Sequence, residues 1–146
     1  MLNKHILIAG RDTEAGLAVA RLFKERGWKI TGLVNNGACS CETTDAEPCV
    51  CADLGDRAAV GKAVADIEAK NGPVGMLFVS IPYLTKLPHS FVDTPIDWWK
   101  ERLDTWLMNT ANLCFHVGKV MTARKDGRMA LLSPDYKDVA GDCIME

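Results

Sequence analysis

The chain has 146 residues, of which 48% are hydrophobic and 25% are charged, and its formal net charge at pH 7 is −2. This length suffices for one globular domain with a single core and is too short for two, so we expect one domain over residues 1–146. The slightly negative charge, a pI near 5.9 and the lack of a lysine and arginine cluster argue against nucleic acid as the main partner.

The first half of the chain alternates between short apolar runs and helical periodicity. The apolar runs predict strands over 5–9, 29–34 and 49–52. Between the first two runs, the spacing predicts a helix over 14–26 that buries Leu17, Val19, Ala20, Leu22 and Phe23. After the third run, Asp56 is expected to cap a helix that ends at Asn71-Gly72-Pro73 and buries Ala59, Val60, Ala63, Val64 and Ile67.

The second half of the chain continues this alternation. Residues 74–80 are continuously apolar, as in a strand that is covered on both faces. Thr94 and Pro95 combine an N-cap with proline at the first helical position, and the helix that they begin is predicted to run to about Arg124. We expect its inward face to hold Leu103, Leu107 and Val117. Gly127 interrupts the pattern before a fifth predicted strand over 128–133.

Five strands separated by helices predict the fold class. Right-handed crossovers between such strands give an α/β, doubly wound Rossmann-like domain with a five-stranded parallel sheet. Ligands of these sheets bind at the carboxyl ends of the strands, near the switch in strand order. We therefore expect residues 10–16, Asp53 and residues 80–83 to surround one crevice.

Several segments carry a resemblance to a known family. The order of KHILIAG, ADLGD, NGPVGMLFVS, FVDTPIDWWKERLD and GRMALLS resembles the N-terminal part of the short-chain dehydrogenases/reductases, over nearly the whole chain. The stretch from Phe78 to Ile81 and the FVDT segment are also similar to the enoyl-acyl-carrier-protein reductase branch of that superfamily. The resemblance implies an NAD(P)-dependent oxidoreductase with a Rossmann fold.

The resemblance also implies a damaged cofactor site. Gly10 matches the family's first glycine, which makes a tight turn, and Gly16 matches the last, which lets helix and strand pack closely. Glu14 replaces the glycine over which the pyrophosphate would lie, so it adds charge and bulk at an anion-binding helix N-terminus. A purely structural role is the alternative, because Glu14 suits the helix dipole while Asp12 and Thr13 cap the helix.

Further cofactor contacts are implied at the ends of the other strands. Asp53 matches the aspartate beside the adenine, although an aspartate after a strand is also a common cap. The family's Asn-Asn-Ala-Gly motif, which borders the nicotinamide, is replaced here by Val79-Ser80-Ile81-Pro82, so Ser80 stands at that place. No acidic residue ends the second strand, at Val34-Asn35-Asn36, and Arg11 could pair with a 2′-phosphate, so NADP(H) is favoured.

The catalytic residues of the family are poorly matched. The asparagine of its fourth helix falls on Trp106, with Asn109 one turn later, and Ser133 stands one position before the active serine. The tyrosine base and its lysine, spaced Tyr-x-x-x-Lys on the next helix, are absent because the sequence ends first. The nearest substitutes, Tyr136 and Lys137, lack a helix to hold them in register. We therefore expect no catalytic residues, with Ser133, Tyr136 and Lys137 as weak candidates.

Six cysteines and the apolar pattern raise a second possibility. The N-terminus lacks a signal peptide and the apolar segments are strand-sized, so we expect a cytoplasmic protein with no membrane partner and mostly reduced cysteines. Four thiolates, from Cys39, Cys41, Cys49 and Cys51, are candidate ligands of zinc or an iron–sulfur cluster. Alternatively, Cys49 and Cys51 are small core residues of a strand. Residues between the second and third strands lack helical periodicity, so a metal-clipped loop, a partner or a compact loop must cover that sheet face.

Three functions stay open from the sequence. They are a non-catalytic subunit or NADP(H)-binding module, an NADP(H)-dependent oxidoreductase completed by a partner chain, and a cysteine-based metal- or redox-responsive protein. A chain cut from a longer precursor is also compatible with the sequence. Trp98, Trp99 and Trp106 cannot all face the sheet, because adjacent helical positions differ by about 100°. We expect at least one to point outward and a homo-oligomer, most simply a homodimer, to form through their helix.

Overall fold

A computed structural model describes residues 3–36, 47–80 and 93–132 of the chain. Its elements, in chain order, are β1 (His5–Ala9), α1 (Glu14–Glu25), β2 (Lys29–Asn35), β3 (Cys49–Ala52), α2 (Arg57–Asn71), β4 (Met76–Val79), α3 (Ile96–Leu103), the π-helical turn η2 (Asp104–Met108), α4 (Asn109–Arg124) and β5 (Arg128–Leu131). The strands form one parallel sheet in the order β3-β2-β1-β4-β5. The predicted doubly wound α/β fold is confirmed.

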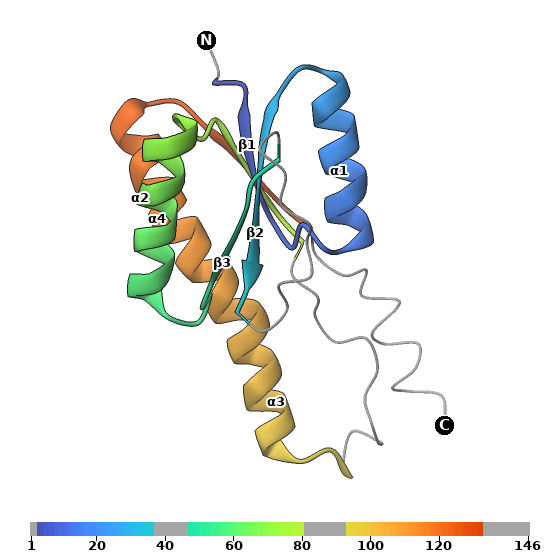
Figure 1. Cartoon of the computed structure of the whole chain (residues 1–146). Helices are drawn as coiled ribbons and strands as arrows, with labels where there is room; N and C mark the ends of the chain where they lie inside the picture. Colours follow the sequence, from blue (N-terminus) through green and yellow to red (C-terminus); the bar gives the residue numbers. More distant parts are fainter. Residues whose placement is uncertain (1–2, 37–46, 81–92, 133–146) are drawn as a thin grey trace.

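Helices cover both faces of the sheet (Figure 1). One face packs against α1, and the opposite face packs against α2 and α4. The core under α2 and α4 joins Leu7, Leu33 and Leu77 of the sheet to side chains of both helices, including Val60, Val64, Ile67, Leu113 and Val117. The core under α1 is smaller and is formed by Ile6, Ile8, Ala20 and Ile30. Among the described residues no helix lies between β2 and β3.

The two shorter predicted helices form where their caps predict. Thr13 caps α1 by accepting a hydrogen bond from Gly16 N, and Asp56 caps α2 by accepting from Ala58 N and Ala59 N. The buried face of α2 is as predicted except for the half-buried Ala59. In α1, however, the predicted burial of Leu17 and Leu22 is wrong, since both are exposed.

A long helix, formed by α3, η2 and α4 without a break, follows β4. It ends at Arg124, as predicted, and begins at Ile96. The predicted cap is wrong by one position, because Pro95 and not Thr94 is the N-cap. The expected burial of Leu103 and Leu107 is wrong, because their side chains are 52% and 51% exposed, whereas Val117 is fully buried.

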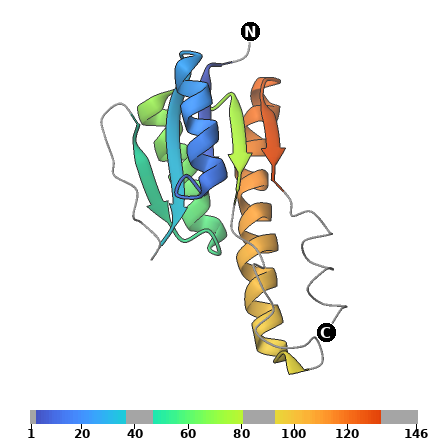
Figure 2. The ribbon, with the colours of Figure 1, turned by 90° about the vertical axis from the view of Figure 1, so that its right-hand side faces the viewer.

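Two features explain this exposure. The turn η2 is π-helical and holds an extra residue, which shifts the helical phase ahead of α4. In addition, α3 extends past the carboxyl ends of the strands, where no sheet lies beneath it (Figure 2). Within the described residues, no helix is long and apolar enough to cross a membrane.

A buried polar chain closes the amino-terminal end of the sheet. His5 at the start of β1 is almost fully buried, with Nδ1 at 2.8 Å from Gly72 O and Nε2 at 2.9 Å from Thr31 Oγ1. Asn71 Nδ2 donates to the same threonine hydroxyl. A neutral ring satisfies every partner: Nδ1–H donates to the carbonyl, and Nε2 accepts from Thr31. Burial lowers the pKa of His5 below its ordinary value of 6.5.

This pKa shift predicts a pH-dependent stability. The unfolded chain binds a proton at His5 near pH 6.5, whereas the folded chain binds it only at lower pH. The free energy of unfolding should therefore fall as the pH drops from about 7.5 to about 5, and it should fall less steeply in His5→Gln. Urea unfolding at several pH values measures both slopes. Equal slopes in the two proteins would contradict the assignment.

Candidate functional site

The turn between β1 and α1 lies beside the end of β4, at the carboxyl edge of the sheet. Ala9 pairs with Val79 in the parallel register, so Gly10 and Ser80 are neighbours. Ser80 N donates to Ala9 O at 2.8 Å, and the Ser80 side chain is buried. The structure therefore brings three predicted site residues together: Gly10, Gly16 and Ser80.

Both predicted glycines of this turn are required by its backbone. Gly10 has φ of 81°, a conformation that L side chains rarely adopt. A Cβ on Gly16 would lie 2.1 Å from Gly10 O, so α1 approaches the turn too closely for any other residue. The roles that the resemblance implied for the first and last glycines fit this geometry.

The Thr13 side chain makes three hydrogen bonds in this turn, of which the sequence predicted only the helix cap. Its hydroxyl donates to Gly10 O at 2.8 Å and accepts from Gly16 N at 3.0 Å. Because that single proton is used, the Ser80 hydroxyl must be the donor in the 3.0 Å contact between Thr13 Oγ1 and Ser80 Oγ. Thr13 thus uses its proton and both lone pairs within the protein. Threonine at an N-cap was predictable, but its bond to a residue on a distant strand was not.

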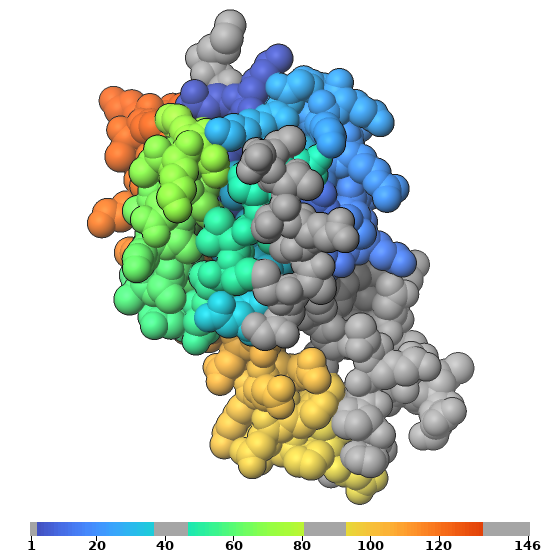
Figure 3. Space-filling model, in the orientation of Figure 1, coloured from blue at the N-terminus to red at the C-terminus, as the bar shows by residue number. Residues whose placement is uncertain are grey.

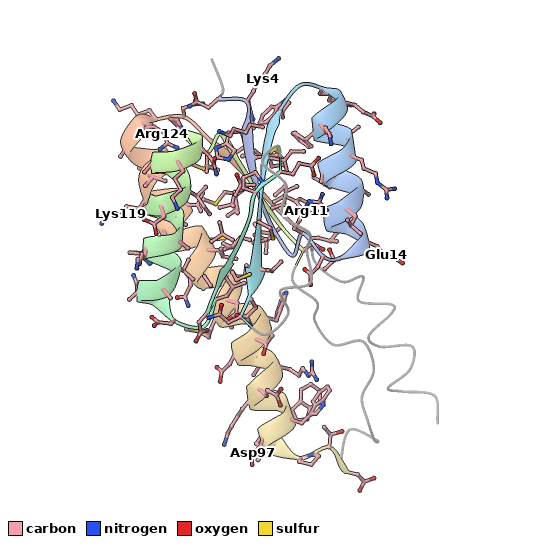
Figure 4. All side chains as sticks on the ribbon, viewed as in Figure 1. Lys4, Arg11, Glu14, Asp97, Lys119 and Arg124 are labelled. Carbon is pink, nitrogen blue, oxygen red and sulfur yellow. The ribbon has the colours of Figure 1, made fainter. Side chains whose placement is uncertain are left out.

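Glu14 occupies the first position of α1. Its side chain is exposed and points away from the sheet at the helix N-terminus (Figure 4). A carboxylate at this end is favourable for the helix dipole. The same charge opposes any phosphate that approaches the free N–H groups of the first turn.

Arg11, predicted as a partner for a 2′-phosphate, is paired with a carboxylate of the protein itself. Its Nη2 lies 2.8 Å from Glu47 Oε2, and Lys24 Nζ lies 2.5 Å from Glu47 Oε1. Figure 4 shows Arg11 between the sheet and α1. Hydrogen bonds from Lys24 and Arg11 lower the pKa of Glu47 below its usual range. The sequence did not predict a role for Glu47, because its partners Arg11 and Lys24 are far from it along the chain.

Asp53 lies on the other side of the crevice, after β3. Its Oδ1 accepts from Gly55 N at 2.9 Å and from Asp56 N at 3.3 Å, so it caps the turn into α2. The turn is held from below by Asn112, whose Nδ2 donates to Leu54 O at 2.9 Å. Asn35 Oδ1, at the end of β2, accepts from Leu54 N at 3.0 Å.

Asn109 is buried beside this turn. A Cβ on Gly55 would lie 3.2 Å from Asp53 Oδ1 and 3.6 Å from Asn109 Oδ1, so the two side chains flank the glycine. The resemblance placed the family's asparagine at Trp106, which the structure puts within the π-helical turn η2. Asn109, one turn later, follows η2 directly and is buried.

The predicted metal ligands receive no support. Cys49 and Cys51 are disulfide-bonded, so the expectation that they are reduced is wrong. A disulfide sulfur is not a thiolate ligand. In the part of the chain that the structure describes, no group of three His, Cys, Asp or Glu side chains is placed to hold a metal ion. Cys39 and Cys41 lie outside the described residues.

The candidates Ser133, Tyr136 and Lys137 also lie outside the described residues. Both tyrosines of the chain, Tyr83 and Tyr136, fall there, and neither is followed four residues later by lysine. The described side of the crevice offers hydroxyl, amide and carboxylate groups from Thr13, Ser80, Asn109 and Asp53. Thr13 has no hydrogen-bonding capacity left for a ligand, and among the described residues the hydrogen bonds of the other three side chains include no cation that would make one of them an acid.

The turn between β1 and α1 keeps one part of a dinucleotide-binding turn. A Cβ at Gly16 would meet Gly10 O, so helix and strand have the close packing that the family's last glycine allows. The fit is poorer at Glu14, which repels phosphate, and at Arg11, whose guanidinium is already paired. The backbone of this turn is therefore compatible with a nucleotide, whereas the charges at Glu14 and Arg11 are less favourable for one.

Comparison with known proteins agrees with this geometry. Residues 12–142 match the family model described as enoyl-(acyl carrier protein) reductase. No curated protein matches the chain.

Three solved structures share the fold. The structure of gox2181 is 20% identical, with a TM-score of 0.78, and the match covers 91% of this chain and 54% of that one. A putative 3-oxoacyl-reductase from Bacillus thuringiensis is 21% identical with a TM-score of 0.74, covering 93% and 60%. A gluconate 5-dehydrogenase from Burkholderia cenocepacia J2315, in complex with NADP and tartrate, is 19% identical with a TM-score of 0.71, covering 90% and 53%. The chain thus spans little more than half the length of these proteins.

The close approach at Gly16 predicts an unusual effect of alanine. In a helix interior, glycine to alanine normally stabilises by about 1 kcal/mol. Gly16→Ala should instead destabilise by about 1–3 kcal/mol, because its Cβ meets the backbone oxygen of Gly10. Urea unfolding gives the difference.

A matched control for this prediction is Gly118→Ala in α4. There the nearest atom to a new Cβ is the flexible Met129 Cε at 3.2 Å, which is free to move. The control should be neutral or stabilising. Destabilisation of both proteins by the same amount would show that the contact at Gly10 is not the cause.

Proposed function

The chain belongs to the short-chain dehydrogenase/reductase superfamily, within the family described as enoyl-(acyl carrier protein) reductase, and from this premise we propose that it binds a nicotinamide dinucleotide without catalysing hydride transfer by itself. The observation that carries this proposal is the contact between Gly16 and Gly10 O beside the buried Ser80. That contact sets the backbone for a pyrophosphate at the start of α1.

The residues that would hold the nucleotide come from three strand ends. The free N–H groups of the first turn of α1 would face the pyrophosphate, and Ser80 would lie on the nicotinamide side. Asp53 and the buried Asn109 border the adenine side. When bound, the nucleotide supplies a hydride donor or acceptor.

The proposal that the chain lacks catalysis rests on proton chemistry. Reduction of a carbonyl requires an acid that protonates the developing alkoxide, and such an acid needs a tuned pKa and a fixed position. The sequence contains no Tyr-x-x-x-Lys pair. Among the described residues, the Thr13 hydroxyl already uses its one proton to bond Gly10 O.

Of the two dinucleotides, NAD(H) and NADP(H), only NADP(H) has support. Asn35 and Asn36 at the end of β2 place no carboxylate against a 2′-phosphate, which favours NADP(H). One solved structure of similar fold contains NADP. Arg11 gives no further support for NADP(H), because its guanidinium is already paired with Glu47.

A titration tests binding and catalysis together. The purified chain should bind NADH and NADPH, seen as a change in nicotinamide fluorescence, and should show no reduction of ketones, aldehydes or enoyl thioesters above background. Glu14→Gly should tighten the binding of both nucleotides by about threefold to tenfold, because it removes a negative charge from the helix N-terminus.

Glu25→Gly, at the other end of α1, is the matched control and should leave both affinities unchanged. Absence of binding in the wild-type chain and in Glu14→Gly would refute the nucleotide site. A turnover number of about 1 s⁻¹ or more would refute the lack of catalysis.

We also propose a homodimer through the long helix that contains Trp98, Trp99 and Trp106. None of these tryptophans is fully exposed, and Trp98 packs edge-on against Trp99 with ring centroids 5.2 Å apart. The exposed apolar side chains of the helix are instead Ile96, Leu103, Leu107, Met108 and Phe115. In the space-filling view α3 projects from the body of the molecule (Figure 3). An apolar surface of this kind favours association.

A charge on this surface should separate the dimer. Sedimentation equilibrium of the wild-type chain should give about twice the monomer mass of 16.0 kDa, and Leu107→Lys should give the monomer. Leu22→Lys places the same charge on an exposed leucine of α1 and should leave the dimer intact. A wild-type monomer would exclude this interface.

A further inference from the structure

The backbone of Arg11 lies in the turn between β1 and α1, whereas its guanidinium lies at Glu47. Its backbone follows Gly10 directly, but its stem lies on the middle of β2, where a Cβ on Gly32 would be 2.9 Å from Arg11 Cγ and 3.0 Å from Arg11 Cβ. Gly32 is three residues before Asn35, the last residue of β2, which is roughly 10 Å along the strand. The guanidinium is thus directed toward the amino-terminal half of the sheet.

Glu47 is what holds the guanidinium there. Gly32 pairs with Cys49 in the register of β2 and β3, so Glu47, two residues earlier, lies on the side of Gly32 away from the crevice. Its two carboxylate oxygens are divided between Arg11 and Lys24, the latter on the last turn of α1. The Arg11 and Glu47 side chains are only 18% and 19% exposed, so water screens this pair less than a surface ion pair.

The pair is present throughout the neutral pH range. Hydrogen bonds from Lys24 and Arg11 lower the pKa of Glu47, so its carboxylate stays ionised there. A phosphate that seeks the same guanidinium must displace a charge that is already in place. Arginine binds carboxylate and phosphate in the same way, through its planar fork of N–H donors.

Resting on the proposed function, we propose that Glu47 determines nucleotide selectivity: by holding Arg11 away from the crevice, it removes the preference for NADP(H) over NAD(H) that Arg11 would otherwise confer. The arginine remains within reach, because rotation about its side-chain bonds would carry the guanidinium from Gly32 to the carboxyl edge. Glu47 acts as an internal carboxylate in place of the 2′-phosphate.

The affinities of NAD⁺ and NADP⁺ for four proteins test this role. The wild-type chain should prefer NADP⁺ by no more than about threefold, since only the lack of a carboxylate at the end of β2 then favours it. Glu47→Gln, which keeps the side-chain shape and removes the charge, should raise the preference for NADP⁺ by tenfold or more. Adding Arg11→Gln to Glu47→Gln should abolish the gain. Lys24→Gln is the matched control, since it removes the other partner of Glu47 and should leave the ratio unchanged.

The single variant Arg11→Gln provides a second test, which does not depend on whether Glu47→Gln folds. It should leave the ratio unchanged, because Arg11 does not contact the nucleotide while Glu47 is charged. A selective loss of NADP⁺ affinity in Arg11→Gln, or an unchanged ratio in folded Glu47→Gln, would overturn the role of Glu47 and leave the nucleotide site standing. Failure of every protein to bind either nucleotide would instead refute the proposed function and this inference with it.

Discussion

The close packing of α1 against the first turn is the constraint on which the rest of the structure depends. Gly16 meets Gly10 O at a distance that excludes even a methyl group, and this fixes the start of α1 directly above the end of β1. Thr13 then reaches Ser80 on β4, the other neighbour of β1. A single turn thereby joins the centre of the sheet to one covering helix.

Most of the fold was predictable because local patterns determine it. The five residues of β1 are all buried, and a continuous apolar run is the expected signature of a central parallel strand. Asp56 and Thr13 marked helix starts through side-chain chemistry that needs only neighbouring residues. The order of strands and helices then leaves few topologies.

The errors come from interactions that no local pattern contains. Leu103 and Leu107 fit an inward stripe of a regular helix, but the π-helical turn changes the phase and α3 leaves the sheet. Cys49 and Cys51 alternate along β3 as in a half-buried strand, but this spacing does not indicate whether they are oxidised. The glycine turn was predicted, whereas the partners of Thr13 and Arg11 lie on other elements.

The ion pair of Arg11 and Glu47 connects the cover of β2 with the charge near the turn between β1 and α1. With no described helix between β2 and β3, polar side chains cover part of that face, and Gly32 leaves room for the Arg11 stem to lie flat on β2. A guanidinium placed in such a layer must be paired, since an unpaired buried charge costs several kcal/mol. Glu47 satisfies that requirement, and Lys24 balances the second oxygen. If the proposed nucleotide site exists, the contact that covers the sheet also withdraws a cation from it, and a change at Glu47 would alter both the cover and the selectivity.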